Sequence, residues 1–241
     1  MQIFSKIDIG NRRNTNQDAC HTCSLPGDAV LAVVCDGMGG ASGGDIASST
    51  AVGAVANYVN GAYNPKQSNS SVAELLKNAV SSANIEVYDL ACSNEELKGM
   101  GTTIVAAIVR DNTALICNVG DSRAYIIDDN LTQITRDHSV VQSLIESGKL
   151  TPEEARVHPK KNVITRALGV EENVIPDVYE IIFGENSKLL LCTDGLSNFV
   201  SGEEILSTFK NNDIKDVADI LIDKANEGGG GDNITAAVIS H

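Results

Sequence analysis

The chain has 241 residues, of which 42% are hydrophobic and 4% aromatic, and its formal net charge at pH 7 is −14. This length suits one large domain or two small ones, with a core filled mainly by aliphatic side chains. So acidic a surface argues against a nucleic-acid partner, which needs a basic face, and gives no reason to expect binding to an anionic membrane. The N-terminus lacks the order of a signal peptide and no apolar run reaches membrane-spanning length, so we expect a cytoplasmic protein.

In chain order, the first half predicts two strands, two helices and then three closely spaced strands. Their ranges are 2–9, 29–35, 41–59, 71–91, 102–110, 113–120 and 122–128. Ser71 and Glu74 fit a capping box at the start of the second helix. Short turns between the last three strands favour an antiparallel meander.

The second half predicts two short helices, two strands, two more helices and a closing strand, at 139–148, 151–156, 175–183, 188–194, 203–209, 213–226 and 233–240. Thr151, Pro152 and Glu154 supply a cap, a first-turn proline and a capping-box partner. Helix pairs between runs of strands predict an α+β fold, in which two antiparallel sheets pack together and helices lie outside.

The six cysteines predict free thiols. Cys35, Cys117 and Cys192 follow aliphatic residues, as small core residues do. Cys20 and Cys23 have CxxC spacing, but neither a second ligand pair nor a thioredoxin-like βαβ pattern accompanies them. We interpret them as structural thiols in a reducing compartment.

Four aspartates stand beside glycines at the ends of predicted strands. They are Asp36, Asp121, Asp194 and Asp232. Carboxylates that converge must bind protons or a cation, and oxygen donors without a His or Cys cluster favour Mg²⁺ or Mn²⁺. Gly37 can offer its carbonyl, and one carboxylate bridging two such ions suits phosphate-ester hydrolysis.

A phosphate also needs a cationic fork, for which Arg12 and Arg13 are the candidates. A P-loop is disfavoured because the glycine-rich stretch lacks the accompanying Lys-Ser/Thr. A calcium loop is disfavoured because none of the four sites has acidic residues at alternate positions and a closing Glu.

Eight motifs in order make the chain resemble the metal-dependent serine/threonine protein phosphatases (PPM, or protein phosphatase 2C), most closely the compact bacterial type. They are GNRRNTNQD (10–18), CDGMGG (35–40), GMGTTIVAAIV (99–109), VGDSRAYII (119–127), LTQITRDHS (131–139), ITRALG (164–169), LLLCTDGLSNFVS (189–201) and GGGGDNITAAVI (228–239). The resemblance implies one catalytic domain over residues 1–241 with an α-β-β-α sandwich. It also implies hydrolysis of phosphoserine and phosphothreonine with Mn²⁺ or Mg²⁺.

The resemblance also implies roles for individual residues. Asp36 would bridge two metals and Gly37 would offer its carbonyl to one, while Asp194 and Asp232 complete the shell of the other. Asp18 would serve the same metal from beside that shell, through water or directly, and Asp121 with Asp194 would hold a third, weaker ion.

Arg13 matches the phosphate-binding arginine, whereas Arg12 would be solvated. Asn233 would orient Asp232. The segment 139–165 corresponds to a variable flap that could select substrates.

Two positions depart from the family pattern. Family members often carry a histidine general acid where this chain has Met38 or Ala41. His138 is the nearest titratable substitute by motif, although the family's usual pattern favours a structural role for it.

We expect an active phosphatase that is a monomer and opposes a bacterial-type serine/threonine kinase. A pseudophosphatase that acts as a binding or signalling module and a hydrolase of small phosphate esters are the alternatives.

Overall fold

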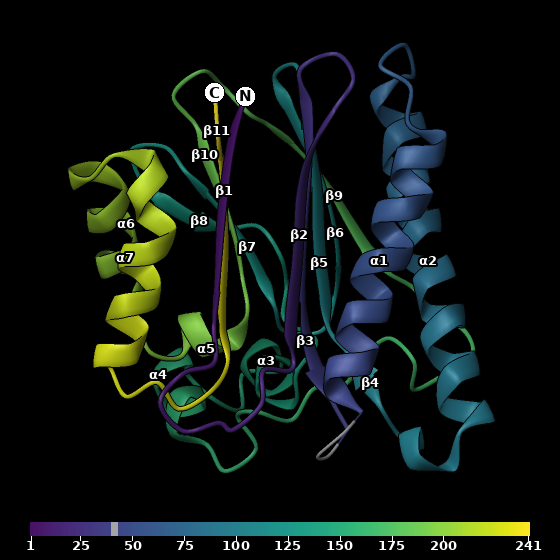
Figure 1. Cartoon of the computed structure of the whole chain (residues 1–241). Helices are drawn as coiled ribbons and strands as arrows, with labels where there is room; N and C mark the ends of the chain where they lie inside the picture. The colour runs from purple at the N-terminus through teal and green to yellow at the C-terminus, as the bar shows by residue number, and fades with distance from the viewer. Residues whose placement is uncertain (40–42) are drawn as a thin grey trace.

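Two antiparallel sheets pack face to face, and a pair of long helices covers the outer face of each (Figure 1). The computed structural model describes residues 1–39 and 43–241. The α-β-β-α sandwich confirms the predicted fold class. Both chain termini lie at the same end of the sandwich (Figure 1).

The first sheet has the strand order β1-β11-β10-β7-β8. Its strands are β1 (Gln2–Asp8), β11 (Ile234–Ser240), β10 (Lys188–Cys192), β7 (Arg123–Ile127) and β8 (Leu131–Gln133). Helices α6 (Gly202–Asn211) and α7 (Ile214–Glu227) cover it. Since β11 lies between β1 and β10, the sheet joins the two ends of the chain.

The second sheet has the order β2-β3-β5-β6-β9, with β4 also paired to β3. Its strands are β2 (Asp18–Leu25), β3 (Ala29–Met38), β4 (Gly101–Thr102), β5 (Ile104–Arg110), β6 (Thr113–Val119) and β9 (Asp177–Ile182). Helices α1 (Gly44–Ala62) and α2 (Asn69–Ser93) cover it, and a short 3₁₀ helix, η2 (Glu95–Leu97), follows α2.

Strand β3 shows how the sequence builds the layers. Leu31, Val33 and Cys35 pack toward the helices, whereas the intervening Val30, Ala32 and Val34 pack against the other sheet. Both sets are 2% exposed or less. A strand buried on both faces needs this continuous apolar run.

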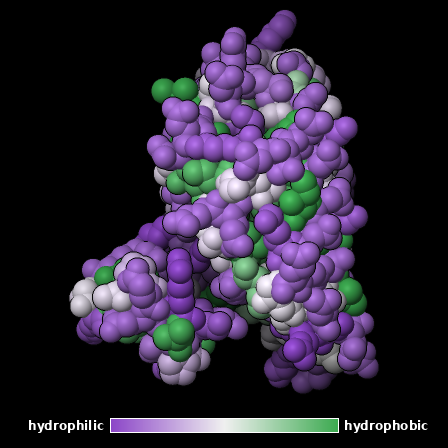
Figure 2. All heavy atoms as spheres, turned by 90° about the vertical axis from the view of Figure 1, so that its left-hand side faces the viewer, coloured by the Kyte–Doolittle hydropathy of each residue, from purple (hydrophilic) through white to green (hydrophobic). Residues whose placement is uncertain are grey.

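The segment 139–165 contains two short helices, α3 (Val140–Glu146) and α4 (Pro152–Val157). Both helices predicted for this segment are therefore confirmed. The predicted capping box of Thr151 and Glu154 is present. A bridge between Ser139 and Ile164 closes the segment at its base. Figure 2 shows a lobe projecting from the end of the molecule where Figure 1 places these helices.

The capping box predicted for the second helix was wrong, and the elements β2, β8 and α5 (Asp194–Ser197) were not predicted. Helix α2 begins at Asn69, and its N-cap is Ser68, whose hydroxyl accepts the Ser71 N–H, so Ser71 and Glu74 form no capping box. Strand β2 was not predicted, because its polar and small residues lack an aliphatic alternation.

The CxxC pair lies on β2. Cys20 packs between the two sheets and Cys23 packs toward the helices α1 and α2. Both cysteines are free. Residues three apart on a strand point to opposite faces, so the pair forms no joint metal or redox site.

None of the helices in the described ranges is both long and apolar enough to cross a bilayer.

Candidate active site

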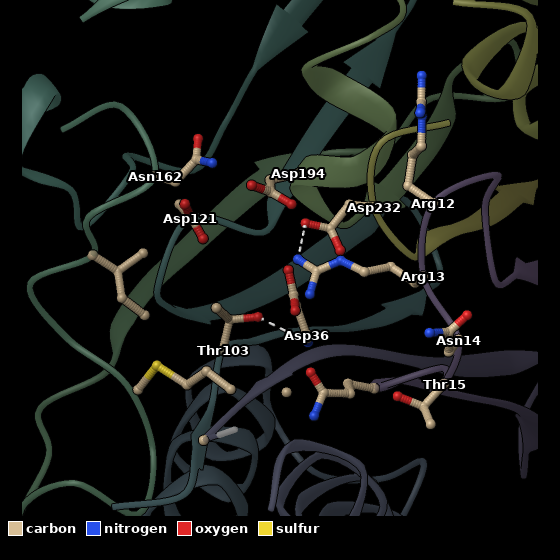
Figure 3. Close-up of a pocket in the computed structure, with 15 residues that line it drawn as sticks. Arg12, Arg13, Asn14, Thr15, Asp36, Thr103, Asp121, Asn162, Asp194 and Asp232 are labelled. Carbon is tan, nitrogen blue, oxygen red and sulfur yellow. Dashed lines mark hydrogen bonds and ion pairs between the residues drawn. The ribbon is translucent and has the colours of Figure 1, made fainter. Parts of the chain in front are cut away.

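A cleft of about 660 Å³ opens at one end of the sandwich, and side chains from both sheets line it (Figure 3). It contains four of the predicted aspartates and both candidate arginines. The lining residues are Arg12, Arg13, Asn14, Thr15, Gln17, Asp36, Gly37, Met38, Gly39, Thr103, Asp121, Asn162, Ile164, Asp194 and Asp232. The predicted convergence of carboxylates is therefore present.

Asp36 lies near the end of β3, and the chain around it is tied to its neighbours. Its backbone N–H donates to the Thr103 hydroxyl at 3.0 Å. Its carbonyl accepts from the Thr102 hydroxyl and the Thr103 N–H, each at 2.9 Å. The carboxylate is thus free to face the cleft while its backbone is held.

Asp18 is the register partner of Asp36 on β2 and lies beneath the cleft, 9% exposed. Its Oδ2 accepts from the hydroxyls of Thr235 at 2.6 Å and Thr193 at 2.9 Å. Burial, followed by the nearby carboxylates, raises the Asp18 pKa to about 7, although the two hydroxyls oppose this.

Asp194 and Asp232 come from the other sheet. Asp194 begins the short helix α5 (Asp194–Ser197), and its Oδ2 accepts from the Asn198 side chain at 3.0 Å. Asp232 precedes β11, and its Oδ1 accepts from the Asn233 backbone N–H at 2.9 Å.

Asp121 lies in the turn between β6 and β7. Its pKa is raised to about 7, first by burial and then by Asp194 and Asp137. The neighbouring Gly120 is fixed from both sides, since its N–H donates to His138 Nδ1 at 3.1 Å and its carbonyl accepts the His138 N–H at 2.9 Å.

Burial and the charges of neighbouring carboxylates disfavour the ionised form of each aspartate in the cleft. Burial, followed by the charges of Asp18 and Asp194, raises the Asp36 pKa well above its ordinary value. The Asp194 pKa is also raised, by burial and then by Asp232. A cation between such groups reverses this effect by favouring their charged forms.

The donor set fits a hard divalent cation. Within residues 1–39 and 43–241, the buried oxygens Asp18 Oδ1 and Asp194 Oδ1 have no hydrogen-bond partner, as a metal ligand would require. Across the same residues, no three His, Cys, Asp or Glu side chains gather closely enough to hold an ion by themselves. An ion here would therefore also take backbone carbonyls or water, as Mg²⁺ commonly does.

Gly37 is required by packing. A Cβ at this position would lie 1.9 Å from the Gly44 carbonyl oxygen at the start of α1 and 2.7 Å from that of Gln17. Because both contacts are backbone atoms, no side chain can be accommodated here without moving α1 or the loop before β2.

The two arginines differ in orientation. Arg13 Nη2 forms an ion pair with Asp232 Oδ2 at 2.8 Å. Figure 3 shows its guanidinium between Asp232 and Asp36, whereas Arg12 points away from the carboxylates. Arg13 is 49% exposed, so it is open to an anionic ligand.

Asn233 holds the loop that carries these arginines. Its side-chain amide donates to the carbonyls of Ile9 and Thr15, at 2.9 and 3.0 Å, and its Oδ1 accepts the Gln17 N–H at 2.8 Å. Among the hydrogen bonds of the described residues, Asn233 reaches Asp232 only through its backbone N–H, so its side chain positions Arg13's loop rather than Asp232.

His138 does not line the cleft. Its side chain is 1% exposed, and Nε2 lies 3.1 Å from Asp177 Oδ2. Burial lowers its pKa. Since Nδ1 accepts from Gly120, the neutral ring carries its proton on Nε2 toward Asp177, which supports a structural role. Met38 does line the cleft, and the Ala41 position lies outside the described residues.

Sequence reasoning missed several residues here. Thr193 and Thr235, which hold Asp18, stand within the LLLCTDG and GGGGDNIT motifs, one residue before Asp194 and three residues after Asp232. Thr103 and Ile164 line the cleft within the motifs at 99–109 and 164–169 without having been assigned a role, and Asn162 lines it outside every motif.

This geometry defines a carboxylate-lined site of the kind that binds metal ions for hydrolysis. The family model for protein phosphatase 2C matches residues 11–221, so the chain belongs to that family.

Relatives cover nearly the whole chain. The serine/threonine phosphatase stp of Listeria monocytogenes is 37% identical over 99% of this chain and 95% of its own length. Protein phosphatase PhpP of Streptococcus pneumoniae is 35% identical over 100% of this chain and 97% of its own.

Solved structures agree. Serine/threonine phosphatase Stp1 from Staphylococcus aureus superimposes with a TM-score of 0.93 at 35% identity, covering 100% of this chain and 94% of that one. The catalytic domain of PstP, solved in complex with two manganese ions, gives 0.85 at 33% identity, covering 98% and 96%.

Proposed function

We propose that this chain hydrolyses phosphoserine and phosphothreonine in proteins with the help of Mn²⁺ or Mg²⁺. One observation carries the proposal: aspartates at the ends of both sheets meet in one cleft beside an arginine, and among the described residues the buried oxygens Asp194 Oδ1 in the cleft and Asp18 Oδ1 beneath it have no hydrogen-bond partner. The relatives' names support the same activity.

The family motifs suggest how the ligands are shared. Asp36 would bridge two ions, with the Gly37 carbonyl on one and Asp194 and Asp232 on the other. Asp18 would support that second shell from below, held by Thr193 and Thr235. Asp121 with Asp194 would hold a third, weaker ion. When bound, such ions supply a nucleophilic water and neutralise charge on the ester oxygens.

Arg13 would bind and orient the phosphate. Its guanidinium already faces the carboxylates, and a phosphate would compete with Asp232 for it. Asn233 keeps that arginine at the rim by fixing its loop. The segment 139–165 supplies Asn162 and Ile164 to the cleft, which supports its role as a substrate-facing flap.

The physiological substrates would be proteins phosphorylated by a serine/threonine kinase, and we retain the prediction of a cytoplasmic monomer. A pseudophosphatase is less favoured because every predicted ligand position holds an oxygen donor.

The test is a metal titration by calorimetry combined with turnover of a phosphopeptide and an aryl phosphate. We expect turnover of both substrates to require Mn²⁺ or Mg²⁺ and to stop with excess chelator. Full turnover after dialysis against chelator contradicts the metal mechanism. Metal binding without turnover favours the pseudophosphatase, and turnover of the aryl phosphate alone favours a hydrolase of small esters.

A further inference from the structure

A second cavity, of about 410 Å³, adjoins the catalytic cleft, and we call it the apolar groove. Met38 and Ile164 line both spaces, so the groove continues directly from the cleft. Its remaining lining is Thr165, Arg166, Ala167, Val170, Glu171, Asn173, Val174, Ile175 and Asp177. Any polypeptide bound with a phosphorylated residue in the cleft would therefore have this groove beside it.

Branched aliphatic side chains stand exposed along the groove. Ile175 is 77% exposed and Val170 is 52% exposed, while Val174 packs partly against the core. Single exposed aliphatic residues are ordinary, but several gathered in a hollow next to an active site indicate a binding surface.

The wall of the groove is held in place from beneath. Asn84, on α2, is 1% exposed, and its amide donates to the carbonyls of Glu171 and Glu172 at 3.1 and 3.0 Å. Its Oδ1 accepts the Gly169 N–H at 2.9 Å. The loop that presents Val170 is thus ordered before a ligand arrives, which lowers the entropic cost of binding.

The charges of the groove do not favour an acidic ligand residue. Among the described residues that line it, Arg166 is the one cation, and Arg166 Nη1 already donates to Asp177 Oδ1 at 3.0 Å. Glu171 adds a further negative charge to the lining. An apolar side chain suits this surface, whereas an acidic one would meet repulsion.

We propose that the apolar groove binds an aliphatic side chain of the substrate protein close to its phosphorylated residue. This inference rests on the proposed phosphatase function and deepens it, since it assigns a sequence preference to the same site. The occupant is a segment of the phosphoprotein, because the groove is continuous with the cleft that takes the phosphate.

The test uses phosphoserine peptides in a Gly/Ser background, in which one Leu or one Asp is moved through the positions on either side of the phosphoserine. For the unmodified chain with Mn²⁺, we expect Leu at one or two positions to raise kcat/KM about tenfold over the background, as filling an apolar pocket does. Asp at the same positions should give no gain.

Val170→Ser with Ile175→Ser should bring the Leu-to-background ratio close to one. Because this ratio compares two peptides on one enzyme, it remains readable when total activity changes. Ile175→Ser alone alters the more exposed side chain and serves if the double variant does not fold. Ile182→Ser is the matched control, since Ile182 is 83% exposed on β9 and lies outside the groove.

A flat Leu scan, or a preference that survives both groove variants, overturns the proposal. Failure of the unmodified chain to hydrolyse either the background peptide or p-nitrophenyl phosphate points instead to failure of the phosphatase function itself. A preference lost equally in Ile182→Ser also counts against the groove.

Discussion

Asp36 is the residue at which a change of one functional group, carboxylate to amide, tests the proposed metal site most directly. Replacing it with Asn keeps the shape of the side chain but removes the anion proposed to bridge two cations. We expect Asp36→Asn to lower kcat at least about 10³-fold toward any phosphate ester, because a neutral amide cannot replace a bridging carboxylate. Steady-state assays at saturating Mn²⁺ measure this. A loss of tenfold or less means that Asp36 is not the bridge.

The two neighbouring arginines provide a matched comparison. Arg13 pairs with Asp232 inside the cleft, whereas Arg12 points away from the carboxylates (Figure 3). A charge-assisted hydrogen bond is worth about 1.5–3 kcal/mol, so Arg13→Ala should raise KM for a phosphopeptide at least about tenfold. Arg12→Ala should change KM less than threefold. Equal small effects would remove both arginines from the phosphate site.

Asp121 should be separable from the proposed two-metal core, since in the proposed arrangement only Asp121 and Asp194 would reach a third ion. We expect Asp121→Ala to lower kcat while the protein still binds two Mn²⁺ ions tightly, one fewer than the unmodified chain at high Mn²⁺. Calorimetry or equilibrium dialysis gives the stoichiometry independently of turnover. An unchanged number of bound ions excludes Asp121 as a ligand of a separate ion.

At the scale of elements, the loop between β1 and β2 depends on a residue from the far end of the chain. Asn233 is 4% exposed and satisfies three backbone groups of this loop. Asn233→Ala leaves those groups without their partner, which should lower the free energy of unfolding by about 1–3 kcal/mol. It should also raise KM for a phosphopeptide, because Arg13 loses its support.

For Asn233→Ala, urea unfolding measures the expected loss of stability, and phosphopeptide kinetics measure the expected rise in KM. The control is Asn212→Ala, which removes one hydrogen bond to Thr208 at an exposed helix end and should change stability by less than about 0.5 kcal/mol. A destabilised Asn233→Ala protein with an unchanged KM would show that the loop does not position Arg13.

The elements that could be predicted from the sequence are those whose residues carry their own signal. The aliphatic runs of β3, β5 and β6 predict buried strands because both of their faces lie against the core. Strand β2 carries no such signal, since it mixes small, polar and cysteine residues without an aliphatic run, and its pairing with β3 makes it a strand. The start of α2 was misplaced because serines stand at 68, 70 and 71 and more than one of them can cap a helix.

The same limit applies to the site. Aspartates beside glycines at strand ends predict a convergence because the chemistry of each position is visible locally. The hydroxyls that hold Asp18 come from 175 and 217 residues away, and the anchoring role of Asn233 spans a similar separation. Such partners follow from the packing of the two sheets, which the local pattern does not reveal.

At the scale of the whole molecule, the two sheets meet at a cluster of like charges, so function and stability oppose one another there. Burial and mutual repulsion raise the pKa values of Asp18 and Asp121 to about 7 and those of Asp36 and Asp194 above their ordinary range. A carboxyl group whose pKa is raised by folding stabilises the protein while it is protonated. That stability is lost as the pH rises through the folded-state pKa.

We therefore expect the metal-free protein, held in chelator, to become less stable as the pH rises from about 4 to about 7. His138, whose pKa is lowered by folding, acts in the opposite direction, because the stability it contributes is lost as the pH falls below the pKa of this histidine in the unfolded chain.

Comparison with Asp36→Asn separates the contribution of the carboxylates from that of His138, since this variant keeps His138 and removes one carboxylate from the cluster. Near pH 7 the metal-free Asp36→Asn protein should be more stable than the unmodified chain, because Asn removes a carboxylate whose charged form burial and the neighbouring carboxylates disfavour. Urea denaturation at several pH values measures this, and saturating Mn²⁺ should reverse the order at pH 7, because only the unmodified chain retains the proposed bridging ligand. If the variant is less stable than the unmodified chain in chelator across this range, burial and mutual repulsion of the carboxylates do not destabilise the metal-free protein.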